Sequence, residues 1–94
     1  MTSQTSQILY KVSQELHLAE DELMIAGMKA VVERTLLELN TQIFEITNRY
    51  QVSSVEEMEA QYERGQLKEA DSWDDFQRLD HLEYRRDQLL LEQY

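Results

Sequence analysis

Residues 20–50 have the sequence EDELMIAGMKAVVERTLLELNTQIFEITNRY, and this stretch decides the fold. Its apolar side chains recur every three or four residues and form one stripe: Ile25, Met28, Val32, Leu36, Leu39, Ile43, Ile46 and Tyr50. A near-heptad repeat of this length predicts a long amphipathic helix. A second apolar row repeats every seven residues beside it: Leu23, Ala30, Leu37 and Phe44. The apolar face is therefore wider than a two-stranded seam, and we expect it to contact more than one neighbour.

The length of this helix points to self-association. A helix from Glu20 to Tyr50 would be about 45 Å long, whereas twice the radius of gyration of a compact chain of 94 residues is about 26 Å. Either the helix bends or a second chain covers its length. We predict a homodimer that pairs through the stripe, with parallel and antiparallel arrangements and a swap of the N-terminal helix left open. Gly27 is either the point of a close helix crossing or a tolerated glycine in the first turns.

The chain before the long helix is short. Residues 1–6 are polar, and we expect them to be a flexible N-terminus. The apolar residues that follow are spaced for one side of a helix: Ile8, Leu9, Val12 and Leu16. We expect this helix to run from Ser6, as its N-cap, to Leu18.

A third helix is predicted soon after residue 50. Ser53 with Glu56, or Ser54 with Glu57, has the three-residue spacing of a capping box. Gly65 is predicted to end this short helix, because glycine readily adopts the left-handed conformation found just after helix ends.

The last helix follows a polar connector at residues 68–72. Asp71 or Ser72 is the expected N-cap, since short polar side chains accept hydrogen bonds from the first backbone amides of a helix. Its main apolar stripe consists of Phe76, Leu79, Leu82 and Leu89. The fold class is therefore all-α: a long helix, an antiparallel partner helix and two short helices. We expect a single helical domain over residues 7–94, assembled as a helical-bundle or coiled-coil homodimer.

Composition excludes several functional classes. The chain has 19 acidic and 9 basic residues, a formal net charge of -10 and no cysteine. Nucleic-acid binding requires a basic surface, so we expect no direct binding of nucleic acid. The same charge disfavours an anionic membrane surface. Without cysteine there is no disulfide framework, thiolate nucleophile or cysteine zinc site.

The first residues and the longest apolar runs bear on localisation. Residues 1–7 are polar and lack the basic and apolar regions of a signal peptide. No apolar run approaches the roughly 20 residues of a membrane span. We therefore expect a cytoplasmic protein with no membrane contact, which the lack of cysteine also suits.

One pattern of acidic residues raises the possibility of an enzyme. Glu56 with Glu59, and Asp71 with Asp74, have the i, i+3 spacing with which all-α nucleotide pyrophosphatases hold Mg²⁺ between facing helices. Gly65 separates the two pairs, and a chain with 19 acidic residues produces such spacings by chance. Mg²⁺-dependent nucleotide hydrolysis is therefore only the third hypothesis. We predict no catalytic residue, metal or cofactor.

The two histidines are interpreted as surface residues. His17 and His81 lie among acidic neighbours, but the chain contains no Glu-x-x-His pair of the kind that binds metals on bundle helices. Isolated histidines on acidic helices are usually solvated.

The last helix carries the residues that we predict to bind a partner: Trp73, Asp74, Asp75, Phe76, Asp80 and Tyr84. Tryptophan is enriched at the energetic centres of interfaces. Small α-helical domains also use a single tryptophan to close a core, and the sequence leaves both roles open. Arg85 and Arg86 are too few, among acidic neighbours, for a nucleic-acid surface.

Five segments together resemble a known group: residues 18–23 (LAEDEL), 26–30 (AGMKA), 45–57 (EITNRYQVSSVEE), 72–76 (SWDDF) and 79–83 (LDHLE). The pattern is similar to that of the small acidic helical proteins encoded beside a toxin in prokaryotic toxin–antitoxin modules. The resemblance implies an antitoxin that wraps its cognate toxin, often a nuclease, and whose carboxylates occupy a basic RNA-binding groove. Many antitoxins also have a basic DNA-binding domain. Neither end of this chain is basic, so operator binding is not expected.

Two non-enzymatic hypotheses follow. In the first, the protein binds and neutralises a basic protein, possibly a toxin, and is a homodimer when free. In the second, it is a structural homo-oligomer whose apolar stripe serves self-association only. A basic protein encoded by the neighbouring gene would favour the first, and a featureless acidic surface after assembly would favour the second.

Overall fold

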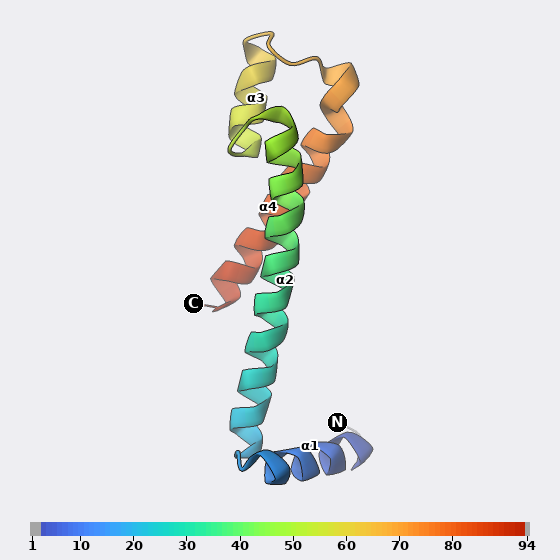
Figure 1. The fold of residues 1–94 in the computed structure, drawn as a ribbon, viewed down its shortest axis with the longest axis vertical. Coiled ribbons are helices and arrows are strands. Elements are labelled where there is room, and N and C mark those ends of the chain that lie inside the picture. The colour runs from blue at the N-terminus through green and yellow to red at the C-terminus, as the bar shows by residue number, and fades with distance from the viewer. Residues whose placement is uncertain (1–2, 94) are drawn as a thin grey trace. The chain divides into compact units, whose positions relative to one another are not determined.

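The computed structural model describes residues 3–93, with side chains described for residues 4–91. Over this range the chain forms α1 (Ser3–Leu16), α2 (Glu20–Tyr50), α3 (Val55–Glu63) and α4 (Glu69–Gln93), and no strand (Figure 1). The predicted all-α class is confirmed, with two long and two shorter helices. The predicted bounds of the long helix are those observed.

Contacts along the backbone divide the chain into two units, Met1–Arg34 and Thr35–Tyr94. We call them the N-terminal unit and the C-terminal unit. The boundary falls inside α2, which belongs to both. The single domain expected over residues 7–94 therefore stays a prediction, and each unit is described by itself.

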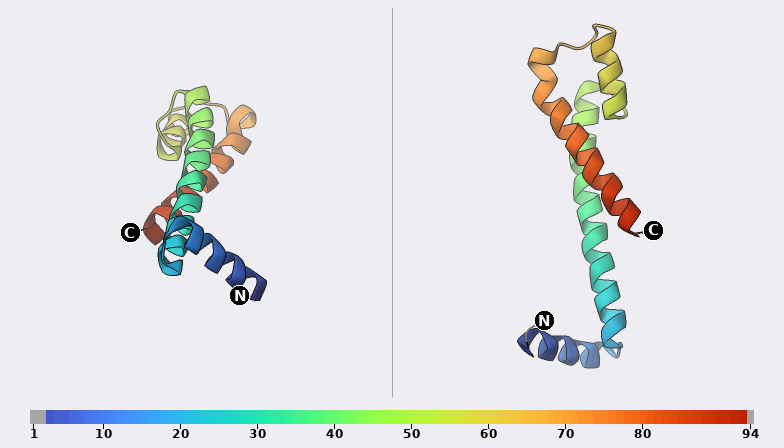
Figure 2. Two further views of the ribbon diagram at one scale, coloured as in Figure 1. Left: turned by 60° about the horizontal axis from the view of Figure 1, so that its bottom comes forward. Right: turned by 180° about the vertical axis from the view of Figure 1, so that it is seen from behind.

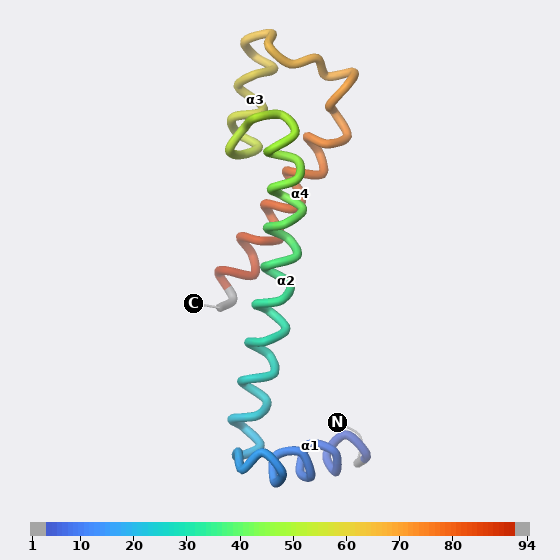
Figure 3. The backbone as a smooth tube through the Cα atoms, in the orientation of Figure 1, coloured from blue at the N-terminus to red at the C-terminus, as the bar shows by residue number. Residues whose placement is uncertain are grey.

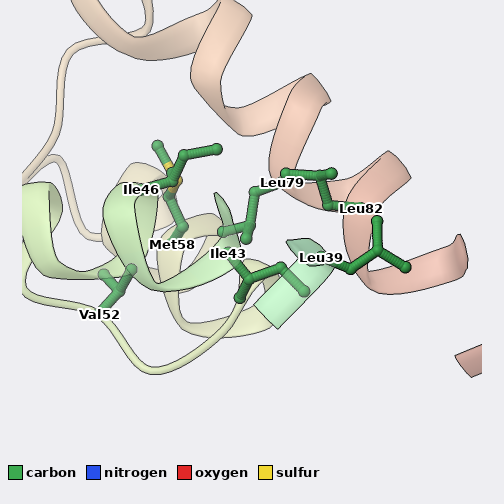
Figure 4. Packing of buried hydrophobic residues seen from close by; sticks show 7 residues of the cluster. All are labelled: Leu39, Ile43, Ile46, Val52, Met58, Leu79 and Leu82. Carbon is green, nitrogen blue, oxygen red and sulfur yellow. The ribbon is translucent and has the colours of Figure 1, made fainter. Parts of the chain in front are cut away.

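The C-terminal unit is a helical hairpin with a core of its own. Within it, α4 runs antiparallel to the second half of α2, and α3 lies beside the end of α2 (Figures 1 and 2). The buried apolar side chains are Leu39, Ile43, Ile46, Val52, Met58, Leu79 and Leu82 (Figure 4). Six half-buried residues pack against them: Tyr50, Val55, Tyr62, Leu67, Phe76 and Leu89. Met58 of α3 and Leu79 of α4 are 0% exposed, so both helices are anchored on α2.

Three helices end in the same way. Residues His17, Gln51 and Gly65 follow the ends of α1, α2 and α3 and have φ of 56°, 54° and 70°. Figure 3 shows the backbone changing direction after each of these three helices. At each end, two backbone amides bond back to carbonyls of the last turn, as Val52 N does to Thr47 O at 3.0 Å. This is the Schellman arrangement, which normally takes glycine because a Cβ disfavours positive φ. Gly65 was predicted in this role, whereas His17 and Gln51 adopt the conformation at a cost.

The start of α3 is capped from two directions. Ser54 has extended backbone, and its hydroxyl accepts a hydrogen bond from Glu57 N, which confirms Ser54 as the N-cap of one of the two predicted capping boxes; the return bond of that box goes to Ser53 rather than to Ser54. The Glu57 carboxylate in turn accepts bonds from the backbone amide and hydroxyl of Ser53. These bonds lower the pKa of Glu57, with the Ser53 hydroxyl as the largest cause. The Glu83 carboxylate of α4 accepts the Val55 amide at 2.8 Å, so α4 satisfies an amide at the start of α3.

Two predicted helix starts were wrong. Helix α1 begins at Ser3 rather than after Ser6, so residues 3–6 are helical; residues 1 and 2 of the expected flexible N-terminus lie outside the described residues. Helix α4 begins at Glu69, so Asp71 and Ser72 are not its N-cap. Ser72 is buried inside the helix and donates to the Lys68 carbonyl at 2.8 Å. Its oxygen also lies 2.5 Å from the Tyr62 hydroxyl, and this tie to α3 favours helix where the sequence indicated a connector.

Candidate functional site

The N-terminal unit has an apolar surface and no apolar core among its described residues. Its large exposed apolar side chains, which we call the N-terminal apolar surface, are Ile8, Tyr10, Val12, Leu16, Leu18, Met24, Ile25, Met28 and Val31. Among the described residues of this unit, Ser13 is buried. Its hydroxyl donates a hydrogen bond to the Tyr10 carbonyl at 2.8 Å. The two helices of this unit therefore leave most of their apolar area in water.

A groove runs along this surface between α1 and the first half of α2. It has a volume of about 630 Å³ and is lined by Leu9, Leu23, Met24, Gly27, Met28, Val31 and Val32. All of these residues are apolar or glycine, and Leu9 is the contribution of α1. A groove without polar groups offers no anchor for a polar small molecule, but it suits apolar side chains of another protein.

Gly27 lines this groove, and no contact within the described chain requires a glycine at this position. A Cβ added at Gly27 would meet no atom within 4 Å beyond its own stretch of helix backbone. Glycine inside a helix costs about 1 kcal/mol relative to alanine. Nothing described within the chain approaches Gly27 closely enough to need the missing side chain, so the close crossing considered from the sequence is not made within the chain.

The predicted self-association stripe is divided between two environments. Leu39, Ile43 and Ile46 are buried in the core, where α3 and α4 of the same chain cover them. In the single chain these three side chains are covered and are not available on its surface to a second copy, so their part in a dimer stays a prediction.

The remaining members of the stripe are less buried. Tyr50 is half-buried against the core, and Leu36 is half-buried. Val32 is half-buried in the groove. Ile25 and Met28 remain 56% and 59% exposed. The second row also faces solvent in the C-terminal unit, where Leu37 and Phe44 are exposed.

The predicted partner-binding residues are not one uniform surface. Trp73, Asp74, Asp80 and Tyr84 are exposed on α4, whereas Asp75 and Phe76 are half-buried and belong to the packing of the unit. Tyr84 also lines a smaller groove with Thr35, Arg85, Gln88 and Leu89. The predicted site thus contains an exposed acidic and aromatic face and two residues that hold α4 in place.

Trp73 packs within the unit and is also partly exposed, so its packing role is observed while a role in binding a partner stays a prediction. Its ring stacks on Phe76, with ring centres 5.3 Å apart and planes at 22°, and Phe76 meets Tyr62 edge-on at 5.4 Å. Trp73 is nevertheless 43% exposed. The cluster joins α3 to α4 and leaves one side of the indole open to solvent.

Asp75 joins α4 to the end of α2. Its Oδ2 accepts hydrogen bonds from the Tyr50 hydroxyl at 2.5 Å and from the Arg49 guanidinium at 2.7 Å. These bonds lower the pKa of Asp75, and the hydrogen bond from Tyr50 is the largest cause. The hydrogen bond to Asp75 also raises the pKa of Tyr50 and that of Arg49. A carboxylate engaged in this way holds the hairpin together and is not free to meet a partner.

The metal hypothesis gains no support from the geometry. Glu56, Glu59, Asp71 and Asp74 are all exposed. In the part of the chain that the structure describes, no three His, Asp or Glu side chains come together as metal ligands. His17 serves as the left-handed residue after α1, and His81 is exposed on α4.

Within residues 3–93, no helix has both the length and the apolar composition needed to cross a bilayer.

Comparison with known proteins places the chain in a family. Residues 1–93 match the family described as the uncharacterized protein MJ0235 family. The chain belongs to this family. No curated protein and no solved structure matches it.

For this member of the MJ0235 family, sequence reasoning missed that α1 takes part in the apolar surface. Leu9 and the spacing of Ile8, Val12 and Leu16 indicate an apolar side of α1, but periodicity predicts the stripe of α2 as one continuous contact. Only the position of α3 and α4 shows that its second half is already covered.

Proposed function

We propose that the protein acts by binding another protein through the N-terminal apolar surface, and that it is not an enzyme. The observation that carries this proposal is the exposure of nine large apolar side chains on a unit with no buried apolar residue among those described. Three of them, Met24, Met28 and Val31, line the groove together with Leu9 and Leu23, and an exposed apolar groove of this kind marks interaction sites in folded proteins.

The energetics of the unit support the proposal. Complete burial of one Leu, Ile or Met side chain stabilises a protein by about 1.5–3 kcal/mol. An isolated helix of 14 residues such as α1 is marginal in water, because helix nucleation is unfavourable. Covering the surface would therefore stabilise both α1 and the first half of α2, and the unit is most stable when it is bound.

Site-specific photo-cross-linking in the native cell tests the proposal. A cross-linking residue at Ile25 or Met28 is expected to give a discrete protein adduct, and the same residue at the exposed Asn40, in the second half of α2, is the control. A Met28→Glu substitution should abolish the adduct formed from position 25, because a carboxylate cannot enter an apolar groove without a large desolvation cost. Absence of any adduct at both apolar positions would overturn the proposal.

Neutralisation of a basic toxin, implied by the antitoxin resemblance, is a second candidate function. The observation that favours it is the distribution of charge: residues 35–94 contain fourteen acidic and six basic side chains, and Trp73, Asp80 and Tyr84 are exposed there. A strongly acidic surface steers the approach of a basic partner.

Co-expression with the product of the neighbouring gene tests this second function. If that product arrests growth, the wild-type chain should restore growth, and the double variant Trp73→Ala, Asp80→Lys should restore it less. A neighbouring product that is not toxic, or rescue that is unaffected by the double variant, would count against it.

A further inference from the structure

We infer that the occupant of the N-terminal apolar surface is a second copy of this chain, paired antiparallel about a two-fold axis at Gly27. This inference rests on the proposed function and names its partner. It differs from the sequence prediction in two respects. The contact is confined to the N-terminal unit, and the second half of the stripe takes no part in it.

The first argument is the small size of the unit. Below about 40 residues, a folded unit usually needs disulfides, a metal ion or oligomerisation. The N-terminal unit spans residues 1–34, the chain has no cysteine, and no metal-ligand cluster occurs among the described residues. Of these three means of stabilising a small unit, oligomerisation is the one that the sequence allows. A two-fold pairing would set the exposed Met24, Met28 and Val31 of each copy, which line the groove beside Gly27, against the groove of the other, since such interfaces are self-complementary.

The second argument is Gly27. Open space lies above it in the single chain, and it faces the groove. A glycine lets another backbone approach closely. At a two-fold axis the two Gly27 residues would meet each other, which explains why a residue that costs helix stability stands at this position.

The third argument is charge, which also sets the direction of pairing. The N-terminal unit has five acidic and three basic side chains, so it does not strongly repel a copy of itself. Glu20, Gly27 and Arg34 are spaced seven residues apart and lie on one face of α2. Antiparallel pairing about Gly27 places Glu20 opposite Arg34 of the second copy, twice by symmetry. Parallel pairing would oppose like charges and is disfavoured.

Sedimentation equilibrium of the purified full chain tests the inference. We expect a dimer that Met28→Glu dissociates. Glu20→Arg and Arg34→Glu should each weaken dimerisation by about tenfold, because two ion pairs are replaced by repulsions. The double variant should restore most of the affinity. A dimer unaffected by Met28→Glu, or no recovery in the double variant, would overturn the proposed interface.

Gly27→Leu is the matched steric test. A leucine at this position should abolish the dimer while leaving the helix content of the monomer equal or higher, because the added side chain meets open space in the single chain. Far-UV circular dichroism therefore separates a lost contact from a lost fold. A dimer that persists with unchanged affinity would show that no helix crosses at Gly27.

The direction of pairing can be tested because the chain has no native cysteine. A mixture of Glu20→Cys and Arg34→Cys proteins should form mixed disulfides under mild oxidation, and neither protein alone should cross-link efficiently. Disulfides formed by Glu20→Cys alone would establish parallel pairing and overturn the register. If the purified protein is a monomer at all concentrations but cross-links to a different protein in the cell, this inference fails while the proposed function stands.

Discussion

The Tyr50 hydroxyl donates a 2.5 Å hydrogen bond to Asp75, and so joins the last residue of α2 to the second turn of α4. The two groups are 25 residues apart in sequence. The contact joins the end of α2 to the beginning of α4. Arg49 of α2 also binds the same carboxylate oxygen. The strength of the contact between Tyr50 and Asp75 depends on the ionisation of both partners.

Tyr50→Phe should destabilise the protein in a pH-dependent way. The pKa of Asp75 is lowered from its ordinary value of 3.8, so its contribution is present above that pH and is lost as the pH falls through the lower native value. The pKa of Tyr50 is raised from 10.0, so its contribution is present below that pH and is lost as the pH rises through the higher native value. We expect a loss of about 1–2 kcal/mol in unfolding free energy at neutral pH, shrinking at both extremes.

Urea denaturation of wild type and Tyr50→Phe at a series of pH values measures this difference. Asp75→Asn is the matched control, because it keeps an acceptor oxygen for Tyr50 but has no carboxylate to protonate. The acid-side loss should therefore be absent in Asp75→Asn. A Tyr50→Phe penalty of constant size across the whole series would contradict the coupling.

Leu79→Ala should destabilise the C-terminal unit strongly. Leu79 is fully buried between α2 and α3, and removal of a buried leucine side chain costs about 2–5 kcal/mol because a cavity remains. Leu91→Ala on the same helix removes the same atoms from a side chain that is 71% exposed, and should change stability by less than about 0.5 kcal/mol. Thermal denaturation of the two variants compares them directly. Equal effects would mean that α4 does not pack on α2 as described.

Glycine substitutions should have opposite effects at the ends of two helices. Gln51 has φ of 54°, so Gln51→Gly should relieve strain and stabilise by up to about 1 kcal/mol. Gly65→Ala should destabilise by about 1 kcal/mol, because it adds a Cβ at positive φ although no atom blocks the space. Chemical denaturation midpoints give both values. A stabilised Gly65→Ala would show that the turn after α3 does not need the left-handed conformation.

Glu83→Leu should loosen the start of α3. The Glu83 carboxylate accepts the Val55 amide at 2.8 Å, and its side chain is only 14% exposed. Removing the acceptor from a half-buried amide costs about 1–3 kcal/mol, whereas Glu83→Gln keeps an oxygen and should cost less. Hydrogen exchange at the Val55 amide should accelerate in the leucine variant only. Equal exchange rates in both variants would argue that water already satisfies this amide.

Local features of the chain were predictable because their causes are local. The acidic residues at Glu20 and the periodic apolar residues up to Tyr50 indicate the bounds of α2, and both are properties of neighbouring residues. The cap at Ser54 and the turn at Gly65 follow in the same way, from hydrogen bonds and backbone conformation within a few residues. The start of α4 was missed, since the bond between Ser72 and Tyr62 that favours helix there comes from another element.

The sequence by itself therefore determined that the chain is helical, where α2 lies and which of its faces is apolar. It could not distinguish Leu39 from Met28, because both occupy the same stripe with the same spacing. Tertiary structure alone decided that Leu39 is 2% exposed and Met28 59% exposed. The reason is that periodicity depends only on the helix repeat, whereas burial depends on where the chain returns after its turns. Here α3 and α4 return over residues 39–50, and the described structure leaves the earlier part of the stripe open.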